Sequence, residues 1–540
     1  MNPFNLEEIM RRIILPTILV CLLAVSSFAQ EEQSRADGVK KLDMLLSIIN
    51  YAYVDEVNNE KMVEDAIVGM LEELDPHSVY IPEKELKAMN EPLEGNFEGI
   101  GIQFNILKDT LMVVSPISGG PSEKLGIQAG DKILVIDGKN VAGVGLTNSM
   151  VRDKLRGKKG TTVDVEIKRK GEKKLIPFTI ERDKIPLYSV DATYMATPEI
   201  GYIKVNRFAR TTMDEFQKGV AELKGKGAKH LILDLRGNGG GYLQTAVQMA
   251  DEFLESGKMI VYTEGDKQKK EEYKATSRGE FEKGKIAILI DEGSASASEI
   301  VSGAVQDSDR GMIIGRRSFG KGLVQKSFPL TDGSIIRLTT ARYYTPTGRS
   351  IQRPYDDGKD SYYKEINRRF DAGELLVADS IDFPDSLKFS TPNGRLVYGG
   401  GGIMPDIFIP LDTTLSSDLN RELIRRGVYN EFTLTYLDKN RKGLSKDYSN
   451  IEDFKSGFVV DGDFLDQFKA HAEKKNVEWD DEDYENSKKL IDLQLKALIA
   501  RNLFDTSAYF EIINDLNDSY LEAINVIQSD KFEKAKLEYE

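Results

Sequence analysis

Cysteine and histidine are scarce in this sequence, which has one cysteine, Cys21, and three histidines among 540 residues. A disulfide within the chain is therefore impossible, and a zinc site built from cysteines cannot form. Basic residues are also fewer than acidic ones: the sequence has 73 lysines and arginines and 88 aspartates and glutamates, which gives a net charge of −15. Since an acidic surface repels phosphate backbones, we expect no sequence-independent binding of nucleic acid.

Long apolar runs are rare as well, and the one that stands out lies near the N-terminus. Arg11 and Arg12 precede the apolar residues 13–25, and small residues follow up to Ala29. This order is typical of a signal peptide, residues 1–29, and predicts an exported protein of the periplasm or cell envelope. The run is short for a membrane span, which needs about 20 residues. An uncleaved N-terminal segment that anchors the protein to a membrane is the alternative.

Along the remaining sequence the hydrophobic periodicity and composition change several times, as expected for a multidomain α/β protein. Its length exceeds that of one domain, which is about 100–200 residues, and a 40% share of hydrophobic residues can fill folded cores. Helical spacing comes first, then short β-type runs, then strands that alternate with helices, and finally an acidic helical stretch. The expected parts are an N-terminal helical region at 30–94, a β-rich domain at 95–183, an α/β core at 184–410 and a C-terminal extension at 411–540.

A serine at the start of a predicted helix is the first candidate for chemistry. Ser296 follows an apolar strand and is flanked by alanines, so other groups can approach its hydroxyl closely. At a helix start it would face free backbone N–H groups, and the amide of Ala297 is the first candidate to stabilise an oxyanion. Ser296 and Glu299 also fit the S-x-x-E capping box, in which the serine only caps the helix. The local sequence alone favours the cap.

A nucleophilic serine needs a base, and no histidine has a sequence context that ties it to Ser296. Lys321, which lies between two glycines near a buried strand, is the other option. Its pKa would have to fall to about 7–8, which requires roughly 3.5–5 kcal/mol from the fold. Gln325 lies four positions later, so both side chains would share a face if this run is a strand. A neutral amide there can orient the amine without keeping it charged.

Two glycine-rich segments suggest nucleotide binding, but neither completes its motif. Residues 315–321 satisfy G-x-x-x-x-G-K, yet Gly322 stands where a Ser or Thr would bind magnesium, and a strand follows where a helix is required. The amides of residues 237–241 can converge on an anion. Tyr242, however, replaces the last glycine of the dinucleotide fingerprint. We expect no nucleotide cofactor.

Together these segments resemble the C-terminal processing peptidases, which are serine proteases related in core fold to the ClpP/crotonase group. The matching pieces follow one another in order over roughly residues 36–410. They are LDLRGNGGG at 233–241, GSASASEI at 293–300, FGKGLVQ at 319–325, YTPTGRSIQ at 344–352 and GGIMPD at 401–406.

The resemblance implies a Ser-Lys dyad and no metal or organic cofactor. In that family pattern Ser296 is the nucleophile, Lys321 is the general base and Gln325 orients the lysine. All three residue types are present here, which favours an active enzyme over the second hypothesis, a peptide-binding scaffold with an inactive protease-like core.

The resemblance also implies an oxyanion hole made by two backbone amides. Ala297 supplies one, and a glycine of the 237–241 loop, Gly240 in our interpretation, supplies the other. The family loop often has proline at the position of Gly239. The choice between Gly240 and Gly241 therefore stays open.

The β-rich stretch 95–183 resembles a PDZ domain. Its loop matches the G-Φ-G-Φ pattern whose amides receive the C-terminal carboxylate of a peptide, while the peptide adds as a strand. The loop residues are Gly99, Ile100, Gly101 and Ile102. The implied function is an exported endopeptidase that captures protein or peptide substrates by the C-terminus and cleaves them. Members of the family often associate through N-terminal helices, so a homodimer is a further expectation.

Overall fold

The structure is a computed structural model that describes residues 15–117, 119–381 and 384–539. The chain forms two compact units. The first ends at Leu74 and also includes residues 78–80, and the second contains Asp75–His77 and everything from Ile81 onward.

The first unit is built from the two helices α2 (Leu15–Ala52) and α3 (Asn59–Glu72). The predicted helical region is therefore helical, but most of its apolar stripe faces solvent: Leu42, Leu45 and Ile48 are 48%, 52% and 54% exposed. The first part of the predicted signal peptide, residues 1–14, lies outside the described residues. Among the residues that are described, no helix is long and apolar enough to cross a membrane.

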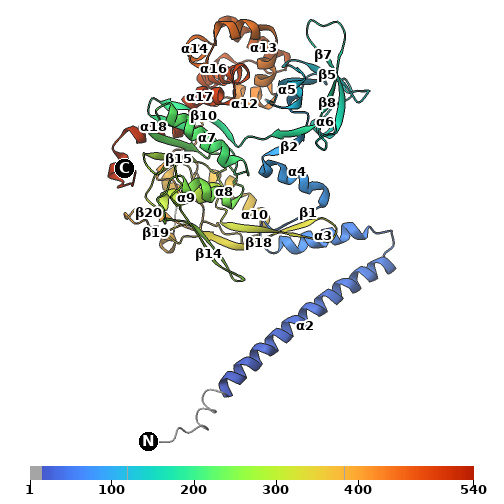
Figure 1. Ribbon diagram of the computed structural model, residues 1–540, viewed down its shortest axis with the longest axis vertical. Helices are drawn as coiled ribbons and strands as arrows, with labels where there is room; N and C mark the ends of the chain where they lie inside the picture. The colour runs from blue at the N-terminus through green and yellow to red at the C-terminus, as the bar shows by residue number, and fades with distance from the viewer. Residues whose placement is uncertain (1–14, 118, 382–383, 540) are drawn as a thin grey trace. The chain divides into compact units, whose positions relative to one another are not determined.

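A β-rich domain begins the second unit after helix α4 (Glu83–Glu94) (Figure 1). Its sheet has the strand order β3-β4-β5-β7-β8, with the short β6 (Lys139–Asn140) paired to β5. A separate antiparallel ribbon, β2 (Asn96–Gly99) with β9 (Asp183–Pro186), joins the points where the chain enters and leaves the domain. The remaining elements are β3 (Ile102–Ile106), β4 (Leu111–Pro116), α5 (Pro121–Lys124), β5 (Lys132–Ile136), α6 (Asn148–Leu155), β7 (Thr162–Lys168) and β8 (Ile176–Glu181).

The α/β core is a second sheet, with the strand order β10-β11-β12-β15-β16-β21. Strand β10 is antiparallel to β11, and the other neighbours are parallel. Helices α7 (Thr212–Gly225), α8 (Leu243–Asp251) and α9 (Ala297–Asp307) follow successive parallel strands, and their apolar residues pack together with alternate strand residues. The strands are β10 (Val190–Thr197), β11 (Ile200–Val205), β12 (His230–Asp234), β15 (Ile286–Ile290), β16 (Met312–Gly315) and β21 (Ile407–Phe408).

In a third sheet β14 pairs with β13, β13 pairs with β18, and β17 pairs with another part of β18. Its strands are β17 (Leu323–Pro329), β18 (Ile335–Tyr344), β13 (Met259–Gly265) and β14 (Gln268–Lys274). Short elements complete this part of the chain: β1 (Val79–Ile81), α10 (Lys359–Tyr363), α11 (Glu365–Asp371), η2 (Ala378–Ser380), η3 (Asp385–Leu387), β19 (Lys388–Ser390) and β20 (Leu396–Tyr398). These observations confirm a multidomain α/β fold.

The C-terminal extension has two parts with separate cores. Six helices bury their own apolar cluster and lie beside the β-rich domain (Figure 1). They are α12 (Asp418–Arg425), α13 (Val428–Asp447), α14 (Ile451–Gly457), α15 (Gly462–Lys474), α16 (Asp481–Leu503) and α17 (Thr506–Ile513). The chain then passes through η4 (Asn514–Leu516) into α18 (Asp518–Gln528) and α19 (Lys531–Lys534), which pack on the α/β sheet.

Helix α18 covers the face of the α/β sheet that α7, α8 and α9 leave open. Ile232 and Leu289 point to this face, whereas their neighbours in the strands point to the other helices. Tyr520 of α18 meets Tyr202 edge-on at 5.4 Å between ring centroids. The last helices therefore belong to the core of the α/β domain, because parallel strands are apolar on both faces and need cover on both.

We expect Tyr520→Ala to lower the free energy of unfolding by about 3 kcal/mol, since the buried ring leaves a cavity between helix and sheet. Urea unfolding followed by circular dichroism measures this change. Leu521→Ala on the same helix is the matched control, because Leu521 is 43% exposed, and it should change stability by less than about 0.5 kcal/mol. Equal effects of the two substitutions would contradict the assignment of α18 to the core.

Candidate active site

Ser296 lies at the sharp turn between strand β15 and helix α9. Its backbone has φ of 56° and ψ of −111°, a left-handed conformation that residues with a side chain rarely adopt. Such strain costs about 1–3 kcal/mol and is concentrated at functional sites. The backbone of Gly240 packs closely against this turn, because a Cβ on Gly240 would lie 2.9 Å from the Cβ of Ser296. Only glycine fits there.

The predicted capping box is present, since Ser296 and Glu299 pair at the start of α9. The Ser296 N–H donates to the Glu299 carboxylate at 2.7 Å. An ordinary capping serine, however, has an extended backbone. The cap therefore describes how the helix begins but does not explain why Ser296 has a positive φ.

The Glu299 carboxylate is fully buried and accepts four hydrogen bonds. One oxygen accepts from the Ser318 hydroxyl at 2.5 Å and the Gly320 N–H at 2.7 Å. The other accepts from the N–H groups of Ser296 at 2.7 Å and Lys321 at 2.9 Å. Burial raises the pKa of Glu299, and the four donors oppose that shift. The four donors match the four acceptor positions of an ionised carboxylate.

Glu299 thereby joins the backbones of Ser296 and Lys321. Both amides bond the same oxygen, so their nitrogen atoms lie within about 6 Å, twice the length of one hydrogen bond. The buried hydroxyl of Tyr343 contacts the carbonyl oxygens of the same two residues, at 3.1 Å for Ser296. Two groups from different elements therefore hold these loops together.

The side chain of Lys321 is mostly buried just before strand β17. Burial lowers the pKa of its amine below the usual value, and the guanidinium of Arg337 lowers it further. The carboxylates of Glu299 and Asp75 oppose this shift. Within the described residues no hydrogen bond joins the Lys321 amine to the Ser296 hydroxyl. Catalytic hydrogen bonds are often long in proteins without substrate and tighten when it binds.

Sequence reasoning missed His77, which lies close enough to Lys321 for the ammonium to act on it. Burial, the charge of Lys321 and that of Arg353 lower the pKa of His77 to about 4, so the ring is neutral at pH 7. Its Nε2 is 3.0 Å from the Tyr362 hydroxyl. No local motif marks this histidine, because tertiary packing alone brings it beside the lysine. The other histidines lie in β12 and in α15.

Gln325 lines the same cleft as Ser296. Its shared face with Lys321 is expected only if the whole run is a strand, and strand β17 begins at Leu323, two residues after Lys321. The alternation of side chains along β17 therefore includes Gln325 but does not reach back to Lys321. The Gln325 amide instead lies 3.4 Å from the carbonyl oxygen of Leu323.

The predicted oxyanion loop places Gly241, rather than Gly240, on the cleft. The Gly240 N–H donates to the Asn238 side chain at 2.9 Å. Gly241 lines a cleft of about 630 Å³ together with Ser296 and Ala297. As the first residue of α9, Ala297 has no intrahelical acceptor for its N–H. Among the described residues, the Gly241 N–H has no acceptor either.

Comparison with known proteins places this geometry in a family. Four parts of the chain match family models: residues 22–85 the N-terminal domain of the activating protease CtpB, 99–180 a PDZ domain, 199–357 peptidase family S41, and 419–505 a family of unknown function. The carboxy-terminal processing protease CtpB of Bacillus subtilis is 36% identical over 336 residues, which are 61% of this chain and 69% of the relative. The chain belongs to the carboxy-terminal processing proteases.

This protease has further relatives of the same kind. The carboxy-terminal-processing protease of Bartonella bacilliformis is 39% identical over 336 residues, 61% of this chain and 76% of that one. A solved photosystem II D1 C-terminal processing protease is 27% identical, covers 67% of this chain and 85% of its own, and has a TM-score of 0.36. The chain is thus a serine-type protease, and the alternative of an inactive scaffold is not supported.

The loop of the PDZ domain connects strands β2 and β3. Gly99 ends β2, Ile102 begins β3, and Gly101 between them has φ of 74°. The side chains of Ile100 and Ile102 are buried in the domain core. In the part of the chain that the structure describes, the N–H groups of Ile100 and Gly101 have no acceptor. They can therefore receive a carboxylate without breaking existing bonds.

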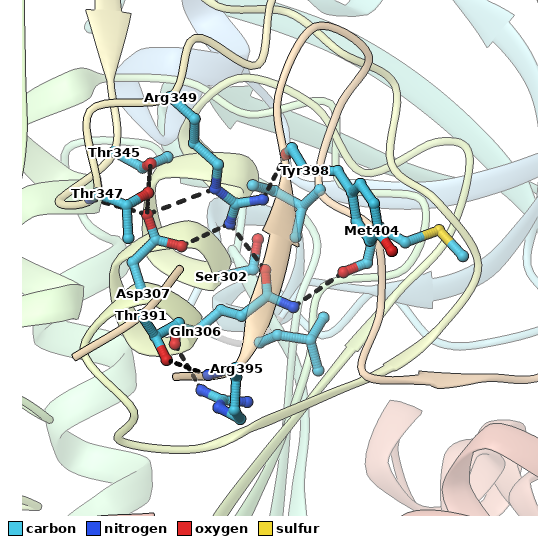
Figure 2. A network of polar contacts seen from close by, with 12 residues as sticks. Ser302, Gln306, Asp307, Thr345, Thr347, Arg349, Thr391, Arg395, Tyr398 and Met404 are labelled. Carbon is cyan, nitrogen blue, oxygen red and sulfur yellow. Dashed lines mark hydrogen bonds and ion pairs between the residues drawn. The ribbon is translucent and has the colours of Figure 1, made fainter. Parts of the chain in front are cut away.

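Two motif segments of the family pattern serve the far end of α9 (Figure 2). Arg349, from the segment 344–352, is fully buried and bonds the Asp307 carboxylate at 2.6 Å and the Gln306 side chain at 2.8 Å. Gln306 in turn donates to the carbonyl oxygen of Met404, in the segment 401–406, at 2.9 Å. These residues fix the helix that begins at Ser296. Among the described residues, no group of acidic, cysteine or histidine side chains has the arrangement of a metal site.

We expect Glu299→Gln to lower the free energy of unfolding by about 2–4 kcal/mol, because an amide NH2 would face groups that also donate. Proteolytic activity should fall as well, since the amide keeps only one acceptor oxygen for the four donors of the loops that carry Ser296 and Lys321. Chemical unfolding and a peptide-cleavage assay measure the two effects. Glu264→Gln, an exposed glutamate in β13, is the control. Equal stability of both variants would refute this role for Glu299.

Proposed function

We propose that this protease cleaves peptide bonds with Ser296 as nucleophile and Lys321 as general base. The observation that carries the proposal is the strained Ser296 backbone, held by the Glu299 carboxylate beside that of Lys321. The neutral amine takes the proton from the serine hydroxyl, the oxygen attacks the substrate carbonyl, and an acyl-enzyme forms as the amine product leaves with a proton. Water then hydrolyses the acyl-enzyme.

The amine must reach the hydroxyl during this reaction. A lysine side chain is flexible and long enough to span the distance of about 6 Å over which the two backbones are held. Ala297 and Gly241 are the proposed oxyanion donors, because they line the cleft and their amides have no acceptor in the described part of the chain. Gln325 remains the proposed orienting residue for the amine when substrate fills the cleft.

The proposed substrates are proteins or peptides held by their C-termini. The loop residues Gly99, Ile100, Gly101 and Ile102 would bind the terminal carboxylate, and the preceding residues would add as a strand to β3, which lies at the end of its sheet. The protein then acts as an endopeptidase and cleaves a peptide bond inside the substrate chain. The proposed domain limits are 30–94, 95–183, 184–410 and 411–540, and the ribbon β2–β9 supports the limits of the PDZ domain.

Export is the remaining part of the proposal. The sequence of residues 1–29 supports a signal peptide, and a periplasmic or cell-envelope location follows from it. An uncleaved segment would keep the protein at the membrane.

The first unit supports a homodimer. Leu42, Leu45 and Ile48 form an exposed apolar face on α2, which a second copy can cover. Sedimentation of the full chain should give a dimer, and Leu45→Glu should give a monomer that stays folded. A wild-type protein that is monomeric at every concentration would rule this arrangement out.

The dyad predicts a large loss of activity in Ser296→Ala. If the serine only caps the helix, the change costs about 1 kcal/mol of stability and leaves cleavage of an unstructured polypeptide intact. If it is the nucleophile, kcat falls by about three orders of magnitude or more while the protein stays folded. A cleavage assay and thermal unfolding, run on the same preparation, distinguish the two.

The same assay tests the lysine through its pH dependence. Only the neutral amine accepts a proton, so kcat/KM should rise with pH through the pKa of Lys321 and then level off. Because burial lowers that pKa, the plateau should begin below the ordinary lysine value of about 10.4. Lys321→Arg should be inactive, since arginine stays protonated. Lys267→Arg, at an exposed turn, should keep the wild-type profile.

A further inference from the structure

A cavity of about 1000 Å³ lies between the PDZ sheet and the six-helix part of the C-terminal extension. One wall is formed by strands β3 and β4, and the other by residues of α13, α16 and the start of α17. Helices α13 and α16 lie beside the PDZ domain in Figure 1. An ion pair between Lys170 and Asp438, at 3.4 Å, joins the domain to α13 nearby. The cavity is separate from the cleft at Ser296, because the two share no lining residue.

The cavity lies where one set of substrate side chains would point. A tail that adds to β3 directs alternate side chains to opposite faces of the sheet. Residues 102–105 of β3 all contribute to the cavity lining; Ile102 is buried in the PDZ core, whereas the side chain of Gln103 is exposed on the other face of the strand. Every second side chain of the tail would therefore leave the PDZ core and face the helices.

The helical wall offers cations without carboxylate partners. Arg501 is exposed, and its guanidinium makes no hydrogen bond or ion pair with any described residue. Arg441 donates to the carbonyl oxygen of Asn502 at 2.6 Å, and burial lowers its pKa with no acidic group opposing the shift. The hydroxyl of Thr433, which also lines the cavity, is buried and has no hydrogen-bond partner among the described residues.

The acidic residues at the same cavity are engaged elsewhere. Asp191 accepts from the side chain of Asn206 at 2.6 Å, and Asp505 caps α17 by accepting from Ala508 N–H at 3.0 Å. Arg501 is near enough to act on Asp191, but no ion pair joins them. The wall made by the extension carries two arginines, Arg441 and Arg501, against one carboxylate, Asp505, since Asp191 belongs to β10. This wall is therefore able to attract an additional negative charge.

We propose that the helical part of the C-terminal extension is a second recognition wall of the PDZ domain, which selects substrate tails with acidic side chains at the positions facing away from the PDZ core. This inference rests on the proposed binding of C-termini at the PDZ loop. In this proposal Arg501 and Arg441 discriminate between substrate tails that the PDZ loop alone would bind with equal affinity.

The test uses the full chain carrying Ser296→Ala, so that peptides are bound and not cut. Two peptides of equal length share the same apolar C-terminus and carry either glutamate or glutamine at the outward positions, the second and fourth from the end. Fluorescence anisotropy should give a Kd about five-fold lower for the glutamate peptide, the size expected of a partly exposed ion pair. Arg501→Gln should abolish this preference and leave the Kd of the glutamine peptide unchanged.

Lys439→Gln is the matched control, because it removes one exposed charge from α13 outside the cavity. The preference for glutamate should survive in this variant. Equal affinities of the two peptides for the parent chain, or a preference that persists in Arg501→Gln, would overturn the second wall while leaving recognition of C-termini intact. Failure of both peptides to bind would overturn recognition at the PDZ loop, and this inference with it.

Discussion

The buried carboxylate of Glu299 is the interaction on which the active site depends. Leaving an ionised group in the protein interior is costly unless hydrogen bonds replace its water. Glu299 meets this demand with four donors, and those donors come from the two loops that carry Ser296 and Lys321. The need to satisfy one charge therefore fixes the relative position of two residues far apart in the sequence. The S-x-x-E pattern begins a helix and joins two loops at the same time.

The burial of helix α9 explains the role of the segments 344–352 and 401–406, which lie outside the proposed dyad. All its residues are buried, so the polar groups at both ends need protein partners instead of water. Glu299 serves the first end. At the other end Arg349 binds Asp307 and Gln306, and neighbouring segments complete the network shown in Figure 2. A helix held at both ends can keep Ser296 in a backbone conformation that a free turn would relax.

The sequence predicted those features that depend on a local residue pattern, and it did not predict the contacts that depend on tertiary packing. The alternation of strands and helices predicted the α/β fold, and the small residues around Ser296 marked the turn that the structure contains. The shared face of Lys321 and Gln325 required a strand from residue 321 onward, and the residue types do not show that strand β17 begins only at Leu323. The choice of Gly240 depended on which amide Asn238 binds. His77 reaches Lys321 only through the fold.

The C-terminal extension illustrates the same limit on a larger scale. Strand β15 is apolar at every position, so the sequence already requires cover on both faces of the sheet. The residues that supply the second cover, in α18, come more than two hundred positions later and after an independent helical core. Composition alone describes both parts as acidic and helical. The packing of α18 on the sheet, with Tyr520 against Tyr202, distinguishes the helix that completes the protease core from the helices that stand beside the PDZ domain.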